Sequence, residues 1–462
     1  MFWNGLQKPS IHLIGIGGSG MSGIAEVLLS LGFPVSGSDM QSSPTTRKLE
    51  KLGAKIYQGH SAAQIGQATC VVVSSAVSPL NPEWLEAIQK KVPVIPRAEM
   101  LAELMRLKLG VAIAGSHGKT TTTSMVGQML QTIDPTVVVG GRLQHWNASS
   151  IVGKGEVFVI EADESDRSFL KFSPVFTVVT NIDREHLDTY RDLKDIESTF
   201  LEFMNGIAFF GANWISADCP SLRAIRKEIS KPVHTYGVAP DADLRITSKT
   251  FKGRTSEFEL EWQGKKLGVF TLPVTGLHNI KNATAAVGIG LSLGLPMKDI
   301  MEGLSNFIPA DRRLQIHLES RDLAVVEDYG HHPTEVEATL DALKLMFPER
   351  ELVVFFQPHR YTRTQALWNE FPLSFEGRCD RLFLLPIYSA HEEPIRGITS
   401  EALSKEFKSL KVEALKAVPS AAEVLEILPV SDRSRVILIL GAGPLTTLAQ
   451  ELAQPVRVGA IG

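Results

Sequence analysis

Residues 110–124 read GVAIAGSHGKTTTTS, and they predict how the middle of the chain folds. The apolar run at 111–114 is typical of a buried parallel strand, and the threonines open a helix that continues through Met129. A glycine turn between strand and helix lets backbone N–H groups close on phosphate oxygens, while Lys119 adds a cation and Thr120 can hold Mg²⁺. The stretch therefore predicts a nucleotide phosphate site, in a variant shorter than the usual loop.

Length and composition set the class of protein. The chain has 462 residues, which is enough for about three domains of ordinary size. Its net charge of -4 gives no electrostatic argument for a nucleic acid or a membrane surface as partner. The three cysteines lie far apart and suit a reducing compartment. No signal peptide and no membrane-spanning run are apparent in the sequence, so we expect a cytoplasmic protein.

A second glycine-rich turn lies near the start of the chain. An expected strand is followed by GIGGSG at 15–20, and the next strand ends at Ser38 and Asp39. This order matches the dinucleotide fingerprint, so an NAD-dependent oxidoreductase is one interpretation. The diphosphate of a UDP-sugar on the helix N-terminus satisfies the same pattern, which leaves both interpretations open. His60 and Ser74 fall at later strand ends, where ligands collect in open α/β sheets.

Acidic side chains end the strands that follow the phosphate loop. Glu161 finishes an apolar strand, and Asp183 follows the next one. An unpaired charge at the end of a buried strand would be costly, so we interpret Glu161 as a Mg²⁺ ligand beside the loop.

The pattern of polar and apolar residues changes after these strands. Residues 234–276 alternate in polarity with period two, which predicts a small antiparallel insertion. Asn279 and Asn282 then lie at the start of an expected helix. Their amides either cap the helix or hydrogen-bond to the edge of an adenine.

The last part of the chain predicts a second open α/β sheet without a lysine-bearing phosphate loop. One expected strand ends in DYGHHPTE at 328–335, and another ends in QPHRYTRT at 357–364. Helix capping does not explain two histidines with two arginines, because arginine forks are how proteins hold carboxylates and phosphates. We therefore expect both strand ends to face a ligand cleft.

Seven motifs occur in the order found in Mur ligases, and the chain resembles that family over essentially its whole length. They are GIGGSGMSGIAE (15–26), GSHGKTTTTSM (115–125), EADESD (161–166), TNID (180–183), the HN-to-NA helix start (278–283), EDYGHHPTE (327–335) and FQPHRYTRT (356–364). Together they are far more specific than a single glycine loop.

The resemblance implies a three-domain α/β protein. We expect a Rossmann-like UDP-sugar-binding domain at 1–107, a central P-loop-type ATP-binding domain at 108–311 that carries the antiparallel insertion, and a Rossmann-like amino-acid-binding domain at 312–462. The implied reaction joins L-alanine to the carboxylate of UDP-N-acetylmuramate through an acyl phosphate, with ATP and Mg²⁺, in peptidoglycan precursor synthesis. NAD is then not expected.

The resemblance also implies roles for single residues. The UDP-sugar would meet Gly15, Gly17, Gly18, Ser19, Gly20, Ser38, Asp39, His60 and Ser74. ATP would meet Gly115, His117, Gly118, Lys119, Thr120, Thr121, Asn279, Asn282, Arg313 and Asp328. Metal ligands would be Thr120, Glu161 and His186. The amino acid would meet Tyr329, His359, Arg360 and Arg363, and the catalytic residues would be Lys119, His332, His359 and Arg360, with a histidine as base.

Overall fold

The structure is a computed structural model that describes residues 8–74, 76–143, 146, 148–428 and 433–454. Its strands form three sheets, and the chain divides into two compact units. The first unit holds the chain up to Ile182 with Glu197–Leu244 and Ala285–Gly303, and the second holds Asp183–Ile196, Arg245–Thr284 and the chain from Leu304 onward. These units cut across the three expected segments, whose bounds stay predictions.

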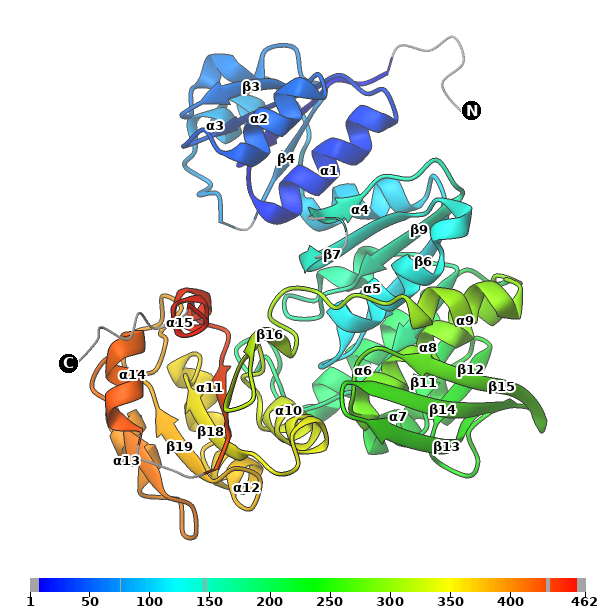
Figure 1. Cartoon of the computed structure of the whole chain (residues 1–462). Coiled ribbons are helices and arrows are strands. Elements are labelled where there is room, and N and C mark those ends of the chain that lie inside the picture. Colours follow the sequence, from blue (N-terminus) through cyan, green and yellow to red (C-terminus); the bar gives the residue numbers. More distant parts are fainter. Residues whose placement is uncertain (1–7, 75, 144–145, 147, 429–432, 455–462) are drawn as a thin grey trace. The chain divides into compact units, whose positions relative to one another are not determined.

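Five parallel strands near the N-terminus, drawn in blue in Figure 1, lie in the order β3-β2-β1-β4-β5. They are β1 (Ile11–Ile14), β2 (Val35–Asp39), β3 (Lys55–Gln58), β4 (Cys70–Val73) and β5 (Val94–Pro96). The connecting helices are α1 (Ser19–Ser30), α2 (Pro44–Lys51), the 3-10 turn η1 (Ala62–Ile65), α3 (Pro82–Gln89) and α4 (Arg97–Met105). The strand order reverses between β1 and β4, and ligands of open α/β sheets bind at such a switch point.

Apolar strands build the core of this sheet. Ile14 on β1 and Val71 and Val73 on β4 pack with Ile65 of η1 and Ala87 of α3, and all five are buried. Each fully buried aliphatic side chain contributes about 1.5–3 kcal/mol relative to an exposed one. This packing fixes the turn that follows β1, and the predicted Rossmann-like fold at the N-terminus is confirmed.

The middle of the chain supplies the strands around the phosphate loop, which neighbour one another in the order β12-β11-β10-β6-β9-β7-β8. They are β6 (Leu109–Ala114), β7 (Thr136–Leu143), β8 (Ala148–Ile151), β9 (Val157–Glu161), β10 (Phe176–Val179), β11 (Ala212–Ser216) and β12 (Val233–Gly237). The helices and 3-10 turns are α5 (Lys119–Met129), η2 (Gln131–Ile133), η3 (Ser168–Lys171), α6 (Leu193–Asn205), α7 (Pro220–Ile225), η4 (Arg226–Glu228), α8 (Leu277–Ser292) and α9 (Met297–Ser305). Because β6 runs parallel between β9 and β10, the carboxyl ends of these three strands meet beside the loop.

The predicted antiparallel insertion consists of β13 (Leu244–Lys252), β14 (Thr255–Trp262) and β15 (Lys265–Leu272). Strands β14 and β15 run antiparallel, with Phe258 opposite Phe270 and their rings stacked at 5.4 Å. The predicted start of the insertion at residue 234 is wrong, because Val233–Gly237 forms β12 and runs parallel to β11. The polarity pattern of a strand reports which of its faces are buried and not the direction of its neighbours, so the pattern could not distinguish parallel from antiparallel pairing.

The C-terminal sheet has the order β16-β17-β21-β18-β19-β20. Its strands are β16 (Gln315–Glu319), β17 (Leu323–Asp328), β18 (Glu351–Phe356), β19 (Arg381–Leu384), β20 (Val412–Ala414) and β21 (Arg435–Leu440). Its helices are α10 (Pro333–Met346), α11 (Tyr361–Ala366), α12 (Glu370–Phe375), α13 (Ser400–Ser404), α14 (Ala421–Ile427) and α15 (Thr446–Leu452). The strand β16, which runs antiparallel to β17, was not expected from the sequence.

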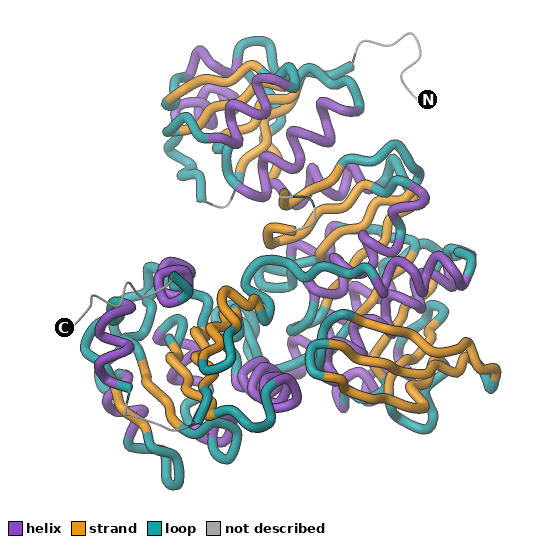
Figure 2. The backbone as a smooth tube through the Cα atoms, in the orientation of Figure 1, coloured by secondary structure: helices purple, strands orange, loops and turns teal. Residues whose placement is uncertain are grey.

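Buried clusters on both faces of this sheet identify it as a doubly covered α/β sheet. Figure 2 shows its strands among purple helices. Asp328 and Phe356 both lie opposite Leu440, so the strand ends at 328–335 and 357–364 flank the end of β21. The predicted three-domain α/β class is confirmed. Across the described ranges, every helix is too short or too polar to span a bilayer.

Candidate active site

The turn between β6 and α5 has the backbone geometry of a phosphate cradle. Gly115 has a φ of +126°, and a Cβ there would overlap the hydroxyl of Thr180. Gly118 has a φ of +84° at the N-cap of α5, where it offers no capping side chain. An uncapped helix start favours an anion, as predicted for the loop at residues 115–121.

Asn181 braces this loop from the end of β10. Its side-chain oxygen accepts from the N–H of His117 at 2.9 Å, and its backbone oxygen accepts from the N–H of Ser116 at 3.1 Å. Thr180 Oγ1 donates to the carbonyl of His117 at 2.6 Å. The loop is therefore held in shape by the neighbouring parallel strand.

Lys119 lies across its own loop. Its Nζ donates to the carbonyls of Gly115 at 2.6 Å and Ser116 at 3.1 Å, and to Oε1 of Glu164 at 2.8 Å. The Glu164 side chain is 1% exposed, so this ion pair is nearly buried. The ammonium is thus fixed over the turn, where an incoming phosphate would meet it.

Thr120 and Glu161 lie together at the opening of α5. The Thr120 hydroxyl is 3.0 Å and 3.1 Å from the two carboxylate oxygens of Glu161, and Glu161 Oε2 also accepts from the N–H of Gly140 at 2.7 Å. A hydroxyl beside a carboxylate is an oxygen donor set of the kind that Mg²⁺ prefers, so these residues fit the ion. His186, the third predicted ligand, belongs to the second unit and lies 3.7 Å from Oε2 of Glu185.

The residues predicted for the UDP-sugar gather at the carboxyl edge of the first sheet. The N–H of Gly15 donates to the carbonyl of Ser38 at 2.8 Å, and a Cβ on Gly15 would lie 3.9 Å from Ser74 Oγ. Nδ1 of His60 lies 3.0 Å from Ser38 Oγ. The turn after β1, the end of β2 and the chain just beyond β3 and β4 therefore meet at one place.

Asp39 closes the glycine turn onto this edge. Its Oδ2 accepts from the N–H of Gly17 at 2.9 Å. Gly18 is the N-cap of α1 and, like Gly118, provides no capping side chain. Ser19 begins α1, but its side chain lies outside the described part of the chain.

Arg97 brings a cation to the same turn. A Cβ on Gly20 would lie 2.7 Å from Nη1 of Arg97, so the guanidinium lies against the first turn of α1. Arg97 follows the last residue of β5, a strand end of the same sheet. That position at a strand end was the available signal in the sequence, and Arg97 was not among the predicted ligand residues.

Two arginines stack on Tyr329 where the chain enters the C-terminal sheet. The guanidinium carbons of Arg312 and Arg313 lie 4.8 Å and 5.2 Å from the ring centroid. Arg312 also binds Oε1 of the buried Glu327 at 2.8 Å. The anchoring residue is therefore Arg312, whereas the predicted nucleotide ligand is its neighbour Arg313.

Asp328 organises its own loop. Its carboxylate accepts from the N–H groups of Leu314 and Gly330 at 2.8 Å each, and from the Thr339 hydroxyl at 3.1 Å. Burial raises the pKa of Asp328 above its ordinary value, although Arg313 and the two N–H groups oppose the change. The proposed contact of Asp328 with nucleotide stays a prediction.

Histidine and arginine side chains from the two predicted strand ends meet in the second unit. The ring of His331 lies 5.5 Å from Tyr329 and 5.6 Å from His359. Arg363 Nη1 lies 3.0 Å from Nδ1 of His359, and Nη2 lies 3.1 Å from Oε1 of Glu185. The side chains of the two strand ends therefore meet, and the ligand cleft expected between them stays a prediction.

A cavity of about 260 Å³ lies beside the cluster. It is lined by Arg184, Glu185, His186, Leu187, Asp188, Arg360, Thr362, Arg363, Gln365, Ala366 and Leu367. On its wall, Arg360 places Nε 2.7 Å from Glu392 Oε1 and Nη1 3.2 Å from Asp188 Oδ2. The fork predicted for a substrate carboxylate is thus engaged by two protein carboxylates here.

Hydrogen bonding fixes the protonation of His359. A guanidinium can only donate, so Nδ1 of His359 accepts from Arg363 and the hydrogen of the neutral ring is on Nε2. Burial, with the charges of His331, Arg363 and Arg360, lowers the pKa of His359 to about 3. His359 is therefore neutral and a weak base near pH 7.

His331 has the opposite environment. Its Nδ1 lies 3.2 Å from the carbonyl of Tyr329 and 3.4 Å from Glu335 Oε2, and its Nε2 lies 3.5 Å from Glu185 Oε1. All three partners are oxygen acceptors, so both ring nitrogens of His331 lie near hydrogen-bond acceptors. His331 stands inside the motif EDYGHHPTE, and its role was not predicted from the sequence.

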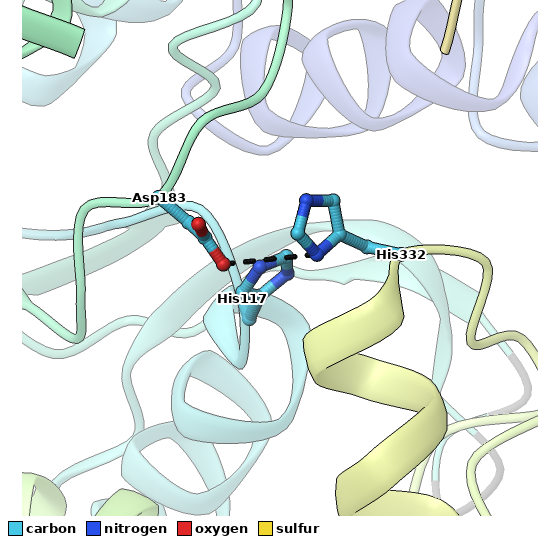
Figure 3. A group of neighbouring side chains, drawn as sticks. All are labelled: His117, Asp183 and His332. Carbon is cyan, nitrogen blue, oxygen red and sulfur yellow. Dashed lines mark ion pairs between the residues drawn. The ribbon is translucent and has the colours of Figure 1, made fainter. Parts of the chain in front are cut away.

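His332 is the N-cap of α10 (Figure 3). Its Nδ1 accepts from the N–H of Thr334 at 3.3 Å and lies 3.6 Å from Asp183 Oδ2, which also accepts from the Thr334 hydroxyl at 2.7 Å. The figure also labels His117, a residue of the first unit. The catalytic role predicted for His332 stays a prediction.

The asparagines predicted for adenosine lie in the first turns of α8 and are buried. The amide of Asn279 donates to the carbonyl of Thr275 at 2.8 Å, and Asn282 lies one turn later. Beside them, burial and the charges of Arg313 and Lys281 lower the pKa of His278 to about 4. This histidine is therefore neutral near pH 7.

Comparison with known proteins identifies the family. Three models match successive parts of the chain: the Mur ligase family catalytic domain at residues 10–109, the Mur ligase middle domain at 113–290, and the Mur ligase glutamate ligase domain at 312–443. The chain belongs to the Mur ligase family. The first glycine turn of this Mur ligase therefore needs no NAD to explain it.

Curated relatives match this Mur ligase over nearly its full length. The UDP-N-acetylmuramate–L-alanine ligase of Desulfotalea psychrophila is 48% identical over 97% of this chain and 98% of its own. The ligase of the same name from Koribacter versatilis is 47% identical over 96% of each chain.

Solved structures agree. The UDP-N-acetylmuramate–alanine ligase of Thermotoga maritima has a TM-score of 0.75 at 28% identity, covering 96% of this chain and 97% of that one. A murein peptide ligase of Psychrobacter arcticus, at 23% identity, shares the fold with a TM-score of 0.66 and covers 97% and 100% of the two chains.

Several partners in the site of this Mur ligase had no role in the sequence reasoning. Glu164 and Asn181 stand inside the quoted motifs EADESD and TNID, so their position after a strand was an available signal. Glu392 lies between β19 and α13, outside the quoted motifs. Its contact with Arg360 depends on a loop whose path the sequence does not specify.

Proposed function

We propose that this Mur ligase joins L-alanine to the carboxylate of UDP-N-acetylmuramate and that ATP is converted to ADP and phosphate in the reaction. The observation that carries the choice of substrates is the identity of 48%, over nearly the full length of both chains, to the UDP-N-acetylmuramate–L-alanine ligase of Desulfotalea psychrophila. The reaction would supply peptidoglycan precursors in the cytoplasm. The phosphate loop with Lys119 supports the use of ATP.

The chemistry proceeds in two transfers. The γ-phosphoryl group of ATP moves to the muramoyl carboxylate, which gives ADP and an acyl phosphate. The amine of L-alanine then attacks the acyl carbon, and phosphate leaves as the amide forms. Because carboxylate and γ-phosphate repel each other, a fixed cation at the loop is needed, and Lys119 is held there.

Thr120 and Glu161 would hold Mg²⁺, and His186 would hold a second ion. When bound, the metal neutralises phosphate charge that Lys119 alone does not cover. The hydrogen bonds between Thr120 and Glu161 keep the two oxygen groups adjacent.

The ammonium group of L-alanine must lose a proton before it attacks. We assign this proton to His331, whose ring nitrogens lie near the oxygens of Tyr329, Glu335 and Glu185. His359, with its pKa lowered to about 3, is suited instead to donate a hydrogen bond from Nε2. Arg360 and Arg363 on the cavity wall would hold the alanine carboxylate.

The other ligand contacts follow the two glycine turns. The diphosphate of the UDP-sugar would lie on Gly15 to Gly20, beside Arg97, with the nucleoside toward Ser38, Asp39 and His60. Asn279, Asn282 and Arg313 would meet the adenosine of ATP.

Phosphate release from ATP tests this function. The assay contains UDP-N-acetylmuramate with L-alanine, L-serine, glycine or the tripeptide L-alanyl-γ-D-glutamyl-meso-diaminopimelate. We expect release to require UDP-N-acetylmuramate and to be fastest with L-alanine, with the amide product confirmed by mass. Phosphate release that is fastest with the tripeptide, or that does not depend on UDP-N-acetylmuramate, contradicts the proposal.

A further inference from the structure

A buried carboxylate lies beneath the edge predicted for the UDP-sugar, and the proposed reaction does not use it. Glu83, in the first turn of α3, is 0% exposed. Its Oε2 lies 2.5 Å from Nε2 of His12, and its Oε1 lies 2.6 Å from Nδ1 of His60. Burial alone would raise the pKa of Glu83, but hydrogen bonds from His12, Ser38 and His60 outweigh it and hold the pKa below its ordinary value.

This arrangement determines which nitrogen of His60 carries the hydrogen. A carboxylate only accepts hydrogen bonds, so Nδ1 of His60 donates to Glu83. A neutral imidazole has one N–H, which leaves Nε2 as an acceptor. The His60 side chain is 19% exposed, and within the described part of the chain no residue is hydrogen-bonded to this Nε2.

His12, on β1, holds the second oxygen of the Glu83 carboxylate. Its Nε2 donates to Glu83, and its Nδ1 lies 2.9 Å from the hydroxyl oxygen of Ser36. The His12 side chain is 0% exposed, which removes it from any contact with ligand. The contact of Oε2 with His12 thus fixes the Glu83 carboxylate with Oε1 toward His60.

His60 lies where a nucleoside is expected. Nδ1 of His60 is 3.0 Å from the Ser38 hydroxyl, and the Ser38 carbonyl accepts from the N–H groups of Gly15 and Ile16. In a sheet of this order the diphosphate lies on the glycine turn and the nucleoside extends over the end of β2. An outward-facing acceptor at this edge can therefore meet a hydrogen-bond donor of the ligand.

We propose that Glu83 is a positioning residue that fixes His60 as a hydrogen-bond acceptor, and that this acceptor selects a nucleobase with an N–H donor. Uracil has such a donor at its imide N3, whereas cytosine has a lone pair at N3 and a methyl group on uracil N3 blocks the contact. The inference rests on the proposed function, because it takes a uridine diphosphate as the ligand.

Calorimetric titration of the full chain with UDP, N3-methyl-UDP and CDP tests the proposal. We expect the wild-type protein to bind UDP about tenfold or more tightly than either analogue, since each leaves a polar group unpaired. Glu83→Met removes the acceptor at similar length and should reduce the preference to about twofold or less. Glu86→Met, on the same helix with its partner Lys90 at the surface, is the matched control and should keep the full preference.

A second variant covers the case in which Glu83→Met fails to fold. His60→Phe keeps a ring at the partly exposed position and removes the acceptor, so it should also lose the preference. ¹⁵N-histidine spectra of the wild-type protein should show His60 with Nδ1 protonated and Nε2 bare.

The outcomes separate the inference from the proposed function. Equal binding of UDP and N3-methyl-UDP by the wild-type protein, or a hydrogen on Nε2 of His60, overturns the assignment of His60 alone. A protein that binds none of the three nucleotides contradicts the UDP-sugar substrate and, with it, both proposals.

Discussion

Nζ of Lys119 lies 2.8 Å from Oε1 of Glu164, a carboxylate that is 1% exposed. The pair keeps a cation fixed over the phosphate loop, with the carbonyls of Gly115 and Ser116 as further acceptors. A lysine ordered in this way needs little rearrangement when a phosphate arrives, which is how preorganised charges stabilise phosphoryl transfer.

We expect Lys119→Ala to reduce amino-acid-dependent phosphate release by roughly a thousandfold or more, because phosphoryl-transfer cations contribute several kcal/mol to the transition state. Steady-state phosphate release measures the loss. Lys171→Ala is the matched control, since Lys171 pairs with Glu99 at an exposed site at 3.2 Å and should leave the rate unchanged. Activity of the Lys119 variant within tenfold of normal would mean that ATP binds elsewhere.

The same pair predicts a stability coupling. Lys119→Ala takes the cation away from a nearly buried carboxylate and should lower the free energy of unfolding by about 1–3 kcal/mol. Adding Glu164→Gln should recover part of that loss without restoring turnover. Urea unfolding of the wild-type protein, the two single variants and the double variant measures the coupling. Strictly additive effects would show that the two side chains do not stabilise each other.

The sequence predicted the local geometry of the glycine loop. The phosphate loop follows from a strand, a glycine turn, a lysine and a helix start, and the positive φ values of Gly115 and Gly118 explain why these positions are glycines. The strand ends at 328–335 and 357–364 could be brought together because carboxyl ends of parallel strands share one edge of a sheet.

The remaining contacts join residues that sequence spacing does not relate. Glu83 and His12 are 71 positions apart, and their pairing depends on how α3 packs over β1. Arg360 was expected to present an open fork, yet Glu392 reaches it from a loop outside the quoted motifs. Such pairs are decided by tertiary packing, which the local pattern does not encode.

His278 predicts a loss of stability in acid. Its pKa is lowered to about 4 by burial and by Arg313 and Lys281, so between about pH 6.5 and pH 4 the unfolded chain binds a proton that the folded chain does not. Stability should therefore fall as the pH drops through this window, by about 1–3 kcal/mol for this group. His359, with a pKa of about 3, acts in the same direction.

Urea unfolding at pH 7.5 and pH 5 measures this effect. His278→Gln removes the proton uptake and should flatten the dependence, whereas His391→Gln, at an exposed position, should leave it unchanged. If His278→Gln unfolds with the same pH dependence as the parent protein, the histidine is already solvated in the folded state.

His331 predicts a pH-dependent rate defect. His331 is proposed to accept the ammonium proton, so His331→Gln should lower kcat by about a hundredfold or more near neutral pH. The defect should shrink as the pH rises toward the pKa of the amine of L-alanine, because the free amine then needs no base. Initial rates across the pH range measure this. His359→Gln is the comparison variant, and any rate defect that it causes should be the same size at every pH because His359 is neutral throughout. A loss of the same size at every pH would remove His331 from the proton transfer.

Arg360 and Glu392 distinguish substrate binding from structural pairing. Nε of Arg360 lies 2.7 Å from Glu392 Oε1, so the guanidinium is held at the cavity wall. Arg360→Lys keeps the charge but loses the planar fork, which should raise KM for L-alanine about tenfold and leave KM for ATP and UDP-N-acetylmuramate unchanged. Glu392→Gln removes the competing carboxylate and should leave KM for L-alanine equal or lower. If both variants lower stability and neither changes KM for L-alanine, Arg360 serves only its ion pairs. If ATP affinity falls instead, the guanidinium belongs to the phosphate site, because a lost fork weakens only the ligand that it holds.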